Sequence, residues 1–123
     1  MQRHPAIYFA PSELHGRGVF TAEDIPEGSV IEICPVLVLS HEQLPLIHRS
    51  ELYEYYFLWG KKKDLPAIVL GFGSLYNHAA SPNARFLPDF SDDTLIITDR
   101  RDIAAGEEIT LDYHAGSEEE VWF

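Results

Sequence analysis

The chain has a single cysteine and few basic side chains. Its 123 residues include only Cys34, which excludes an internal disulfide and a cysteine-based zinc site. The six histidines lack the spacing of metal ligands, so we expect no metal site. Nine Lys and Arg residues stand against 20 Asp and Glu, which gives a formal net charge of −11. Such a chain repels nucleic acid and anionic membranes and attracts a basic partner, although solubility alone explains the charge equally well.

Long hydrophobic runs are also missing. The first residues, MQRHPAIYF, contain no apolar signal segment, and no run approaches the roughly 20 apolar residues of a membrane helix. We therefore expect a cytoplasmic protein with neither membrane nor nucleic acid as a direct partner, and leave action in the nucleus or on host chromatin open. The length predicts one domain over residues 1–123, with residues 115–123 as a short tail, and 46% hydrophobic content suffices for a core.

Short apolar runs separated by turn residues predict a mainly β fold. The expected strands are AIYFA, GVFTA, SVIEI, PVLVLS and PAIVLGF, followed by a hairpin of NARFLP and TLIITD around DFSDD. In the last run, EEITLDYH, alternation places Ile109, Leu111 and Tyr113 on one face. Ser40 begins S-H-E-Q, a capping-box pattern that predicts a short helix over about residues 41–48.

Two segments repeat one pattern. AEDIPEGSVIE and RRDIAAGEEIT share D-I-x-x-G-x-x-I, with Asp24 matching Asp102 at a constant offset of 102 − 24 = 78. Each copy is typical of strand, glycine turn and strand, because glycine allows the positive φ of a tight turn. The repeat predicts two pseudo-symmetric hairpins, and coincidence in a common turn pattern is the alternative.

Two polar turns and a tyrosine could carry chemistry. HGRGVF places Gly16 and Gly18 around Arg17, where exposed N–H groups can hold a carboxylate. The stretch GFGSLYNHAASPN follows the apolar run AIVL and is rich in turn residues and polar atoms. Each turn taken alone is more simply a structural turn, and Tyr113 alone is more simply a core tyrosine with a bonded hydroxyl.

Taken together, these motifs resemble those of the SET-domain protein lysine methyltransferases. The motifs occur in the order G-R-G-V-F, D-I-P-x-G-x-V-I, G-F-G-x-L-Y-N-H-x-x-x-P-N-A and D-I-A-x-G-E-E-I-T-x-D-Y, from about residue 6 to residue 114. The brevity of the chain is most similar to the minimal viral and bacterial members. The resemblance implies a SET fold of the β-clip kind, with several small sheets, one or two short helices and a C-terminal pseudoknot.

The resemblance also implies S-adenosylmethionine as cofactor and a set of site residues. The cofactor-binding residues would be Gly16, Arg17, Gly18, Tyr56, Asn77, His78 and Trp122. The catalytic residues would be Tyr113 and Tyr56, with Tyr56 favoured over Tyr55. The substrate channel would be lined by Tyr76, Phe86 and Leu111.

The implied activity is methyl transfer to a lysine ε-amine in a basic segment, such as a histone tail or another basic protein. From the short chain and its apolar Val-Trp-Phe ending we also expect a homodimer, with the terminal Trp122 and Phe123 covering either the pocket or the interface. One departure from the family is Ala79, which follows N-H where a serine is usual. A non-catalytic β-clip binding module and a cofactor-binding pseudoenzyme are the alternatives.

Overall fold

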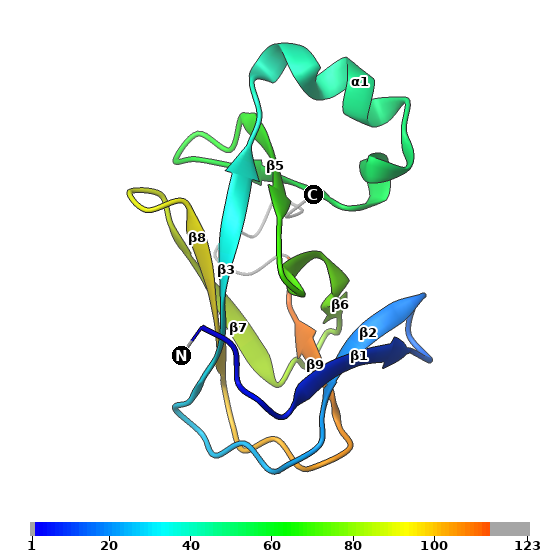
Figure 1. The fold of residues 1–123 in the computed structure, drawn as a ribbon, viewed down its shortest axis with the longest axis vertical. Coiled ribbons are helices and arrows are strands. Elements are labelled where there is room, and N and C mark those ends of the chain that lie inside the picture. Colours follow the sequence, from blue (N-terminus) through cyan, green and yellow to red (C-terminus); the bar gives the residue numbers. More distant parts are fainter. Residues whose placement is uncertain (1, 114–123) are drawn as a thin grey trace.

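The computed structural model describes residues 2–113 (Figure 1). In this part of the chain the strands are β1 (Ile7–Pro11), β2 (Arg17–Thr21), β3 (Val30–Val38), β4 (Tyr56–Trp59), β5 (Leu65–Val69), β6 (Asn77–His78), β7 (Ala84–Asp89), β8 (Thr94–Asp99) and β9 (Glu108–Leu111). The prediction of a mainly β fold is therefore confirmed. The expected tail, residues 115–123, lies outside the described residues, and so does Trp122.

The strands form two sheets. The first has the order β1-β2-β9-β6, and the second has the order β4-β5-β3-β8-β7. Strand β3 pairs with β8 through its first half and with β5 through its second half, so the two runs predicted as separate strands form one long strand. The predicted hairpin of β7 and β8 is confirmed. Strand β6 runs parallel to β9, and the rest of the expected pseudoknot depends on residues 114–123, outside the described range.

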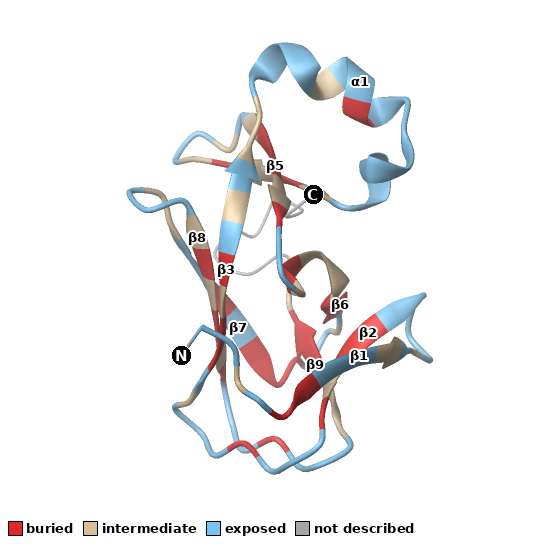
Figure 2. Cartoon of the chain, viewed as in Figure 1, coloured by how far each residue is buried: buried red, intermediate tan, exposed pale blue. Residues whose placement is uncertain are grey.

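A single hydrophobic cluster joins the two sheets. It includes Val19 and Ile109 from the first sheet and Cys34 and Ile97 from the second, all fully buried. Figure 2 shows the buried segments of β2, β9, β3 and β8 in red. Ile109 and Leu111 belong to this cluster and Tyr113 packs against it, as the alternation of the last strand predicts. The core therefore holds the end of β9 in place.

The two copies of the repeated pattern pair with each other. Ile25 and Ile103 exchange backbone hydrogen bonds of 2.7 and 2.8 Å and form an isolated antiparallel bridge. Gly28 and Gly106 both adopt φ of 90°, a conformation that favours glycine. In Figure 1 the two turns lie side by side at the foot of the molecule. The predicted glycine turns and their symmetry are confirmed, but the prediction of hairpins is wrong, because each turn leads from a strand of one sheet to a strand of the other.

The aspartates of the repeat bridge the two copies reciprocally. Asp102 Oδ1 accepts a hydrogen bond from the Glu27 N–H at 2.7 Å, and Asp24 Oδ1 accepts one from the Ala105 N–H at 2.8 Å. Each aspartate therefore caps the turn of the other copy. These contacts join residues that are separated by 75 and by 81 positions in the chain, and they fix where β9 begins.

Three short helical segments follow β3. They are the 3₁₀ turn η1 (His41–Gln43), helix α1 (Leu44–His48) and the 3₁₀ turn η2 (Glu51–Glu54). The predicted helix begins as a 3₁₀ turn, and the Ser40 side chain accepts from Gln43 Nε2 instead of capping a backbone N–H. Ile47 is the buried residue of α1, Leu44 is half-buried, and the other three residues are exposed (Figure 2). None of the helices in the described range is long and apolar enough to cross a membrane.

Candidate functional site

A cavity of about 810 Å³ opens where both sheets and the helical segment meet. Its wall is formed by residues 14–17, 53–56, 74–75 and 77–78 and by Tyr113. These are the loop before β2, the entry to β4, the turn before β6, β6 itself and the residue two positions after β9. Pockets for small molecules span roughly 300–1,000 Å³, so the volume of this cavity lies in the range of small-molecule sites.

The G-R-G motif lies partly on this wall. Gly16 and Arg17 line the cavity, and Gly16 has a φ of 49°, which the turn before β2 requires. Gly18 does not line the cavity. A Cβ at Gly18 would lie 2.2 Å from the Glu108 Oε2 atom. Gly18 therefore leaves room for a neighbouring carboxylate, while the two preceding residues face the cavity.

Asn77 ties the loop before β2 to β9. Its Nδ2 donates to the carbonyl oxygens of His15 at 3.0 Å and Arg17 at 3.2 Å, and to Glu108 Oε2 at 2.8 Å. The other carboxylate oxygen of Glu108 accepts from the Ser12 hydroxyl at 2.6 Å. Glu108 is thus a site residue that the sequence alone does not reveal. The G-E-E-I motif is its signal, but nothing in that motif shows that the second glutamate faces Asn77.

Tyr113 is half-buried at the edge of the cavity. Its hydroxyl donates to the carbonyl oxygen of Tyr76, and its backbone N–H donates to His78 Nδ1 at 3.1 Å. The ring of Tyr113 lies 5.2 Å from the ring of His78. Burial, and next the charge of Glu108, raise the pKa of Tyr113 to about 12. The phenol is therefore protonated at neutral pH and acts as a hydrogen-bond donor.

Tyr56 belongs to an aromatic cluster on the opposite wall. Its hydroxyl lies 3.0 Å from His48 Nε2, and its ring packs against those of His48 and Tyr53, at 5.5 and 6.3 Å between centroids. Burial, and next Tyr53, raise the pKa of Tyr56 above its usual value. Tyr55 lines the cavity too, so the wall does not by itself favour Tyr56. The sequence gives no sign that His48, a single histidine in a helix, contacts Tyr56.

The three residues expected in the substrate channel lie behind the cavity wall. Tyr76, Phe86 and Leu111 are all buried in the hydrophobic cluster, and none of them lines the cavity. The Tyr76 side chain points into the core, where its hydroxyl donates to Glu32 Oε1 at 2.8 Å. Their side chains pack between the sheets and do not reach this cavity. A part in shaping a lysine channel stays a prediction for all three.

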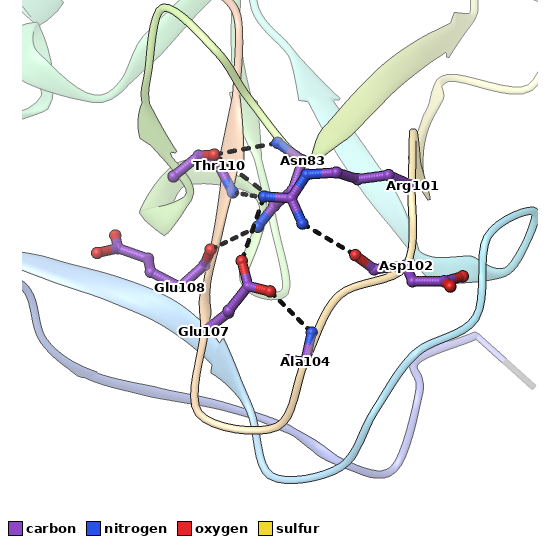
Figure 3. A network of polar contacts seen from close by, with 7 residues as sticks. All are labelled: Asn83, Arg101, Asp102, Ala104, Glu107, Glu108 and Thr110. Carbon is purple, nitrogen blue, oxygen red and sulfur yellow. Dashed lines mark hydrogen bonds and ion pairs between the residues drawn. The ribbon is translucent and has the colours of Figure 1, made fainter.

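The P-N motif holds β9 beside the cavity. Asn83 Nδ2 donates to the Glu108 carbonyl at 2.8 Å, and Asn83 Oδ1 accepts from the Thr110 N–H at 2.8 Å (Figure 3). A buried side-chain amide thus satisfies the backbone of β9 as a neighbouring strand would. The polar turn is structural at Asn83, and it places the strand that carries Glu108 toward Asn77.

A second contact network fixes the turn before β9 (Figure 3). Glu107 accepts from the Ala104 N–H at 2.9 Å and pairs with Arg101 at 3.2 Å. The Ala104 N–H first, and the Arg101 side chain second, hold the pKa of Glu107 below its usual value. The two successive glutamates therefore have separate tasks: Glu107 closes the turn, and Glu108 reaches the cavity loop.

Comparisons with known proteins agree with this geometry. The SET domain family matches residues 16–114. A histone-lysine N-methyltransferase of Schizosaccharomyces pombe, specific for H3 lysine-37, is 34% identical over 113 residues, which are 91% of this chain and 73% of that protein. Human histone-lysine N-methyltransferase 2D is 27% identical over 123 residues, and the match spans 2% of that protein.

Solved structures share the fold. A candidate histone methyltransferase of Plasmodium falciparum superposes with a TM-score of 0.74 at 30% identity, covering 98% of this chain and 100% of that one. The family match extends over most of the chain, and its span includes the G-R-G loop, the N-H turn and Tyr113. The chain therefore belongs to the SET-domain family, as its motifs indicate.

Proposed function

We propose that this SET domain transfers a methyl group from S-adenosylmethionine to a lysine ε-amine in a basic protein segment. The observation that carries the proposal is the placement of Tyr113 at the cavity edge, with its hydroxyl held by the Tyr76 carbonyl. The relatives named as histone-lysine methyltransferases support a protein substrate, and a histone tail is the first substrate to test.

The residues on the cavity wall suit this cofactor. Arg17 offers a guanidinium to a carboxylate, and the loop before β2 offers backbone groups to an amino-acid end. His78 and the tyrosines of the opposite wall offer flat surfaces to a purine ring. Asn77 holds the loop by two hydrogen bonds, to the carbonyl oxygens of His15 and Arg17, so the loop is arranged before any ligand binds. When bound, the cofactor supplies an electrophilic methyl group on a positively charged sulfonium.

The protein side of the reaction is alignment and exclusion of water. A lysine amine has a reference pKa of about 10.4 and must be neutral to act as a nucleophile. The positive charge of a nearby sulfonium would favour the neutral form of the amine. Tyr113, protonated at neutral pH, can orient a polar reacting group but does not serve as an anionic base. Positioning therefore supplies most of the rate.

One assay separates this proposal from its alternatives. The purified protein is incubated with methyl-labelled S-adenosylmethionine and a library of basic peptides that includes histone tails. Labelled lysine supports the proposal. Cofactor binding without transfer indicates a pseudoenzyme, and the absence of both binding and transfer indicates a non-catalytic β-clip module.

We also propose that the protein forms a two-fold homodimer. Large apolar side chains remain exposed on several elements, including Phe9 on β1, Leu46 on α1 and Leu87 on β7, and a dimer could bury part of this surface. Sedimentation at micromolar concentration tests the proposal. A clean monomer would contradict it.

A further inference from the structure

The core contains a buried carboxylate that three donors surround. Glu32 on β3 is 2% exposed. Its Oε1 accepts from the Tyr76 hydroxyl at 2.8 Å, and its Oε2 accepts from the Phe72 N–H at 3.0 Å and Arg3 Nε at 3.2 Å. A buried charge is costly unless it is paired and hydrogen-bonded, so these contacts satisfy a strong requirement. Both oxygens of the Glu32 carboxylate therefore have hydrogen-bond donors inside the core.

This carboxylate closes one turn of the chain at both ends. Phe72 and Tyr76 flank the 3₁₀ turn η3 (Gly73–Leu75), and Glu32 accepts a hydrogen bond from each of them. A Cβ at Gly71 would lie 2.4 Å from Glu32 Oε2, and one at Gly73 would lie 2.0 Å from a Val69 methyl carbon. The glycines of G-F-G therefore leave the space in which β3 and β5 approach the turn.

The closed turn belongs to the wall of the candidate site. Ser74 and Leu75 line the cavity. The next residue, Tyr76, sends its side chain inward to Glu32 and presents its carbonyl oxygen to the Tyr113 hydroxyl. The position of that carbonyl thus depends on where the Tyr76 side chain is anchored. Successive hydrogen bonds therefore connect Glu32, through Tyr76, to the Tyr113 hydroxyl.

We propose that Glu32 is a positioning residue, which acts through Tyr76 to hold the carbonyl that fixes the Tyr113 hydroxyl. The proposal rests on the proposed methyl transfer, because only then does the place of that hydroxyl affect a rate. Its action differs from plain core stabilisation. A positioning residue changes the rate of the bound complex at a temperature where the fold is intact.

The principal test is Tyr76→Phe, which removes the hydroxyl and keeps the ring. Under saturating cofactor and peptide we expect kcat to fall roughly tenfold, with KM within about twofold, because small displacements of a reacting group are costly. Thr21→Val is the matched control, since it also removes a buried hydroxyl. That hydroxyl donates to the Glu23 carbonyl at 2.7 Å, and Thr21 does not line the cavity. An equal loss of kcat in both variants would overturn the proposal.

Glu32→Gln is the second variant, in case Tyr76→Phe folds poorly. It keeps an acceptor for the Tyr76 hydroxyl but weakens the contacts with Phe72 and Arg3. We expect a smaller loss of kcat than in Tyr76→Phe, again without a matching rise in KM. Unchanged kcat in a folded Glu32→Gln variant would contradict a positioning role.

A readout without turnover separates this proposal from the proposed function. With ¹³C-labelled tyrosine, the resonance of Tyr113, assigned by its loss in Tyr113→Phe, reports the surroundings of its hydroxyl at neutral pH. We expect this resonance to shift in Tyr76→Phe, because the carbonyl that accepts from the Tyr113 hydroxyl loses its anchor, and to stay in place in Thr21→Val. A resonance that is unchanged in Tyr76→Phe overturns the inference. If the unmodified protein transfers no methyl, the proposed function fails, while this resonance still decides whether the Glu32 contact positions Tyr113.

Discussion

At the residue scale, the hydroxyl of Tyr113 is the group closest to the proposed chemistry. We predict that Tyr113→Phe folds normally and loses roughly a hundredfold in transfer rate, as for loss of one preorganised donor. Single-turnover kinetics under saturating cofactor measure the change. Tyr8→Phe is the control, because the ring of Tyr8 stacks on Phe20 on the exposed side of β1. Near-normal turnover in Tyr113→Phe would mean that the tyrosine is only part of the core.

Asn77 is the second residue whose removal should be informative. Asn77→Ala is expected to weaken cofactor binding by roughly 1–3 kcal/mol, because the carbonyls of His15 and Arg17 lose their shared donor. Calorimetric titration measures the loss. Asn77→Asp is the variant of equal size, and it should bind less well still, since its carboxylate would face Glu108 where the amide now donates at 2.8 Å. Unaltered affinity in both variants would remove Asn77 from the binding site.

Cys34 should be chemically silent. Burial first, and the charge of Glu32 second, raise the pKa of its thiol, so little thiolate forms in the folded protein. We predict that alkylation of native protein at pH 8 is limited by unfolding and that Cys34→Ser leaves transfer unchanged within about twofold. Rapid labelling without denaturant would show that the core around β3 opens locally.

At the scale of elements, three glycines test how turns are built here. Gly28→Ala and Gly106→Ala should each cost roughly 1–2 kcal/mol in unfolding free energy, because both have a φ of 90° and open space around an added Cβ. Gly71→Ala should cost more, since its φ of 65° is combined with a collision at Glu32 Oε2. Urea denaturation of the three variants gives the ranking. A milder effect at Gly71 would show that Glu32 moves aside easily.

Much of this architecture could be predicted from local patterns. Alternation and turn residues predict most strands, and the repeated D-I-x-x-G predicts both turns, because each depends on neighbours in sequence. The motifs also predict that Asn77 and Tyr113 belong together, and both line one cavity. The place of Glu32 could not be predicted. A glutamate in an apolar strand is expected to face solvent, and its partner Tyr76 is 44 residues away.

The orientation of the Tyr76 side chain could not be predicted for the same reason. Tyr76 follows the glycine-rich turn G-F-G-S-L, so its pattern gives no sign that the side chain points inward. Only the pairing of β3 with β5 and β8 brings Glu32 close enough to accept its hydroxyl. His48 is a similar case, since its contact with Tyr56 depends on how α1 folds back toward β4.

At the scale of the whole molecule, charge should govern substrate capture. The net charge of −11 attracts a basic segment, and salt screens that attraction beyond about 8–10 Å at physiological ionic strength. We predict that the KM for a basic peptide rises severalfold between about 50 and 300 mM salt, with kcat nearly constant. A neutral peptide with the same lysine is the control. A KM that ignores salt would mean that the acidity serves solubility.

The reciprocal caps of the two repeated turns can form only after both turns have been synthesised. Glu27 and Asp102 are 75 residues apart, and translation at roughly 5–20 residues per second needs about 4–15 s to cover that interval. Until then the Glu27 N–H, in the turn after β2, lacks its acceptor. The β1–β2 hairpin also keeps open the edge of β2 that later pairs with β9. An open strand edge invites pairing with other chains. Pairing of β2 with β9 closes this open edge once both strands have been made.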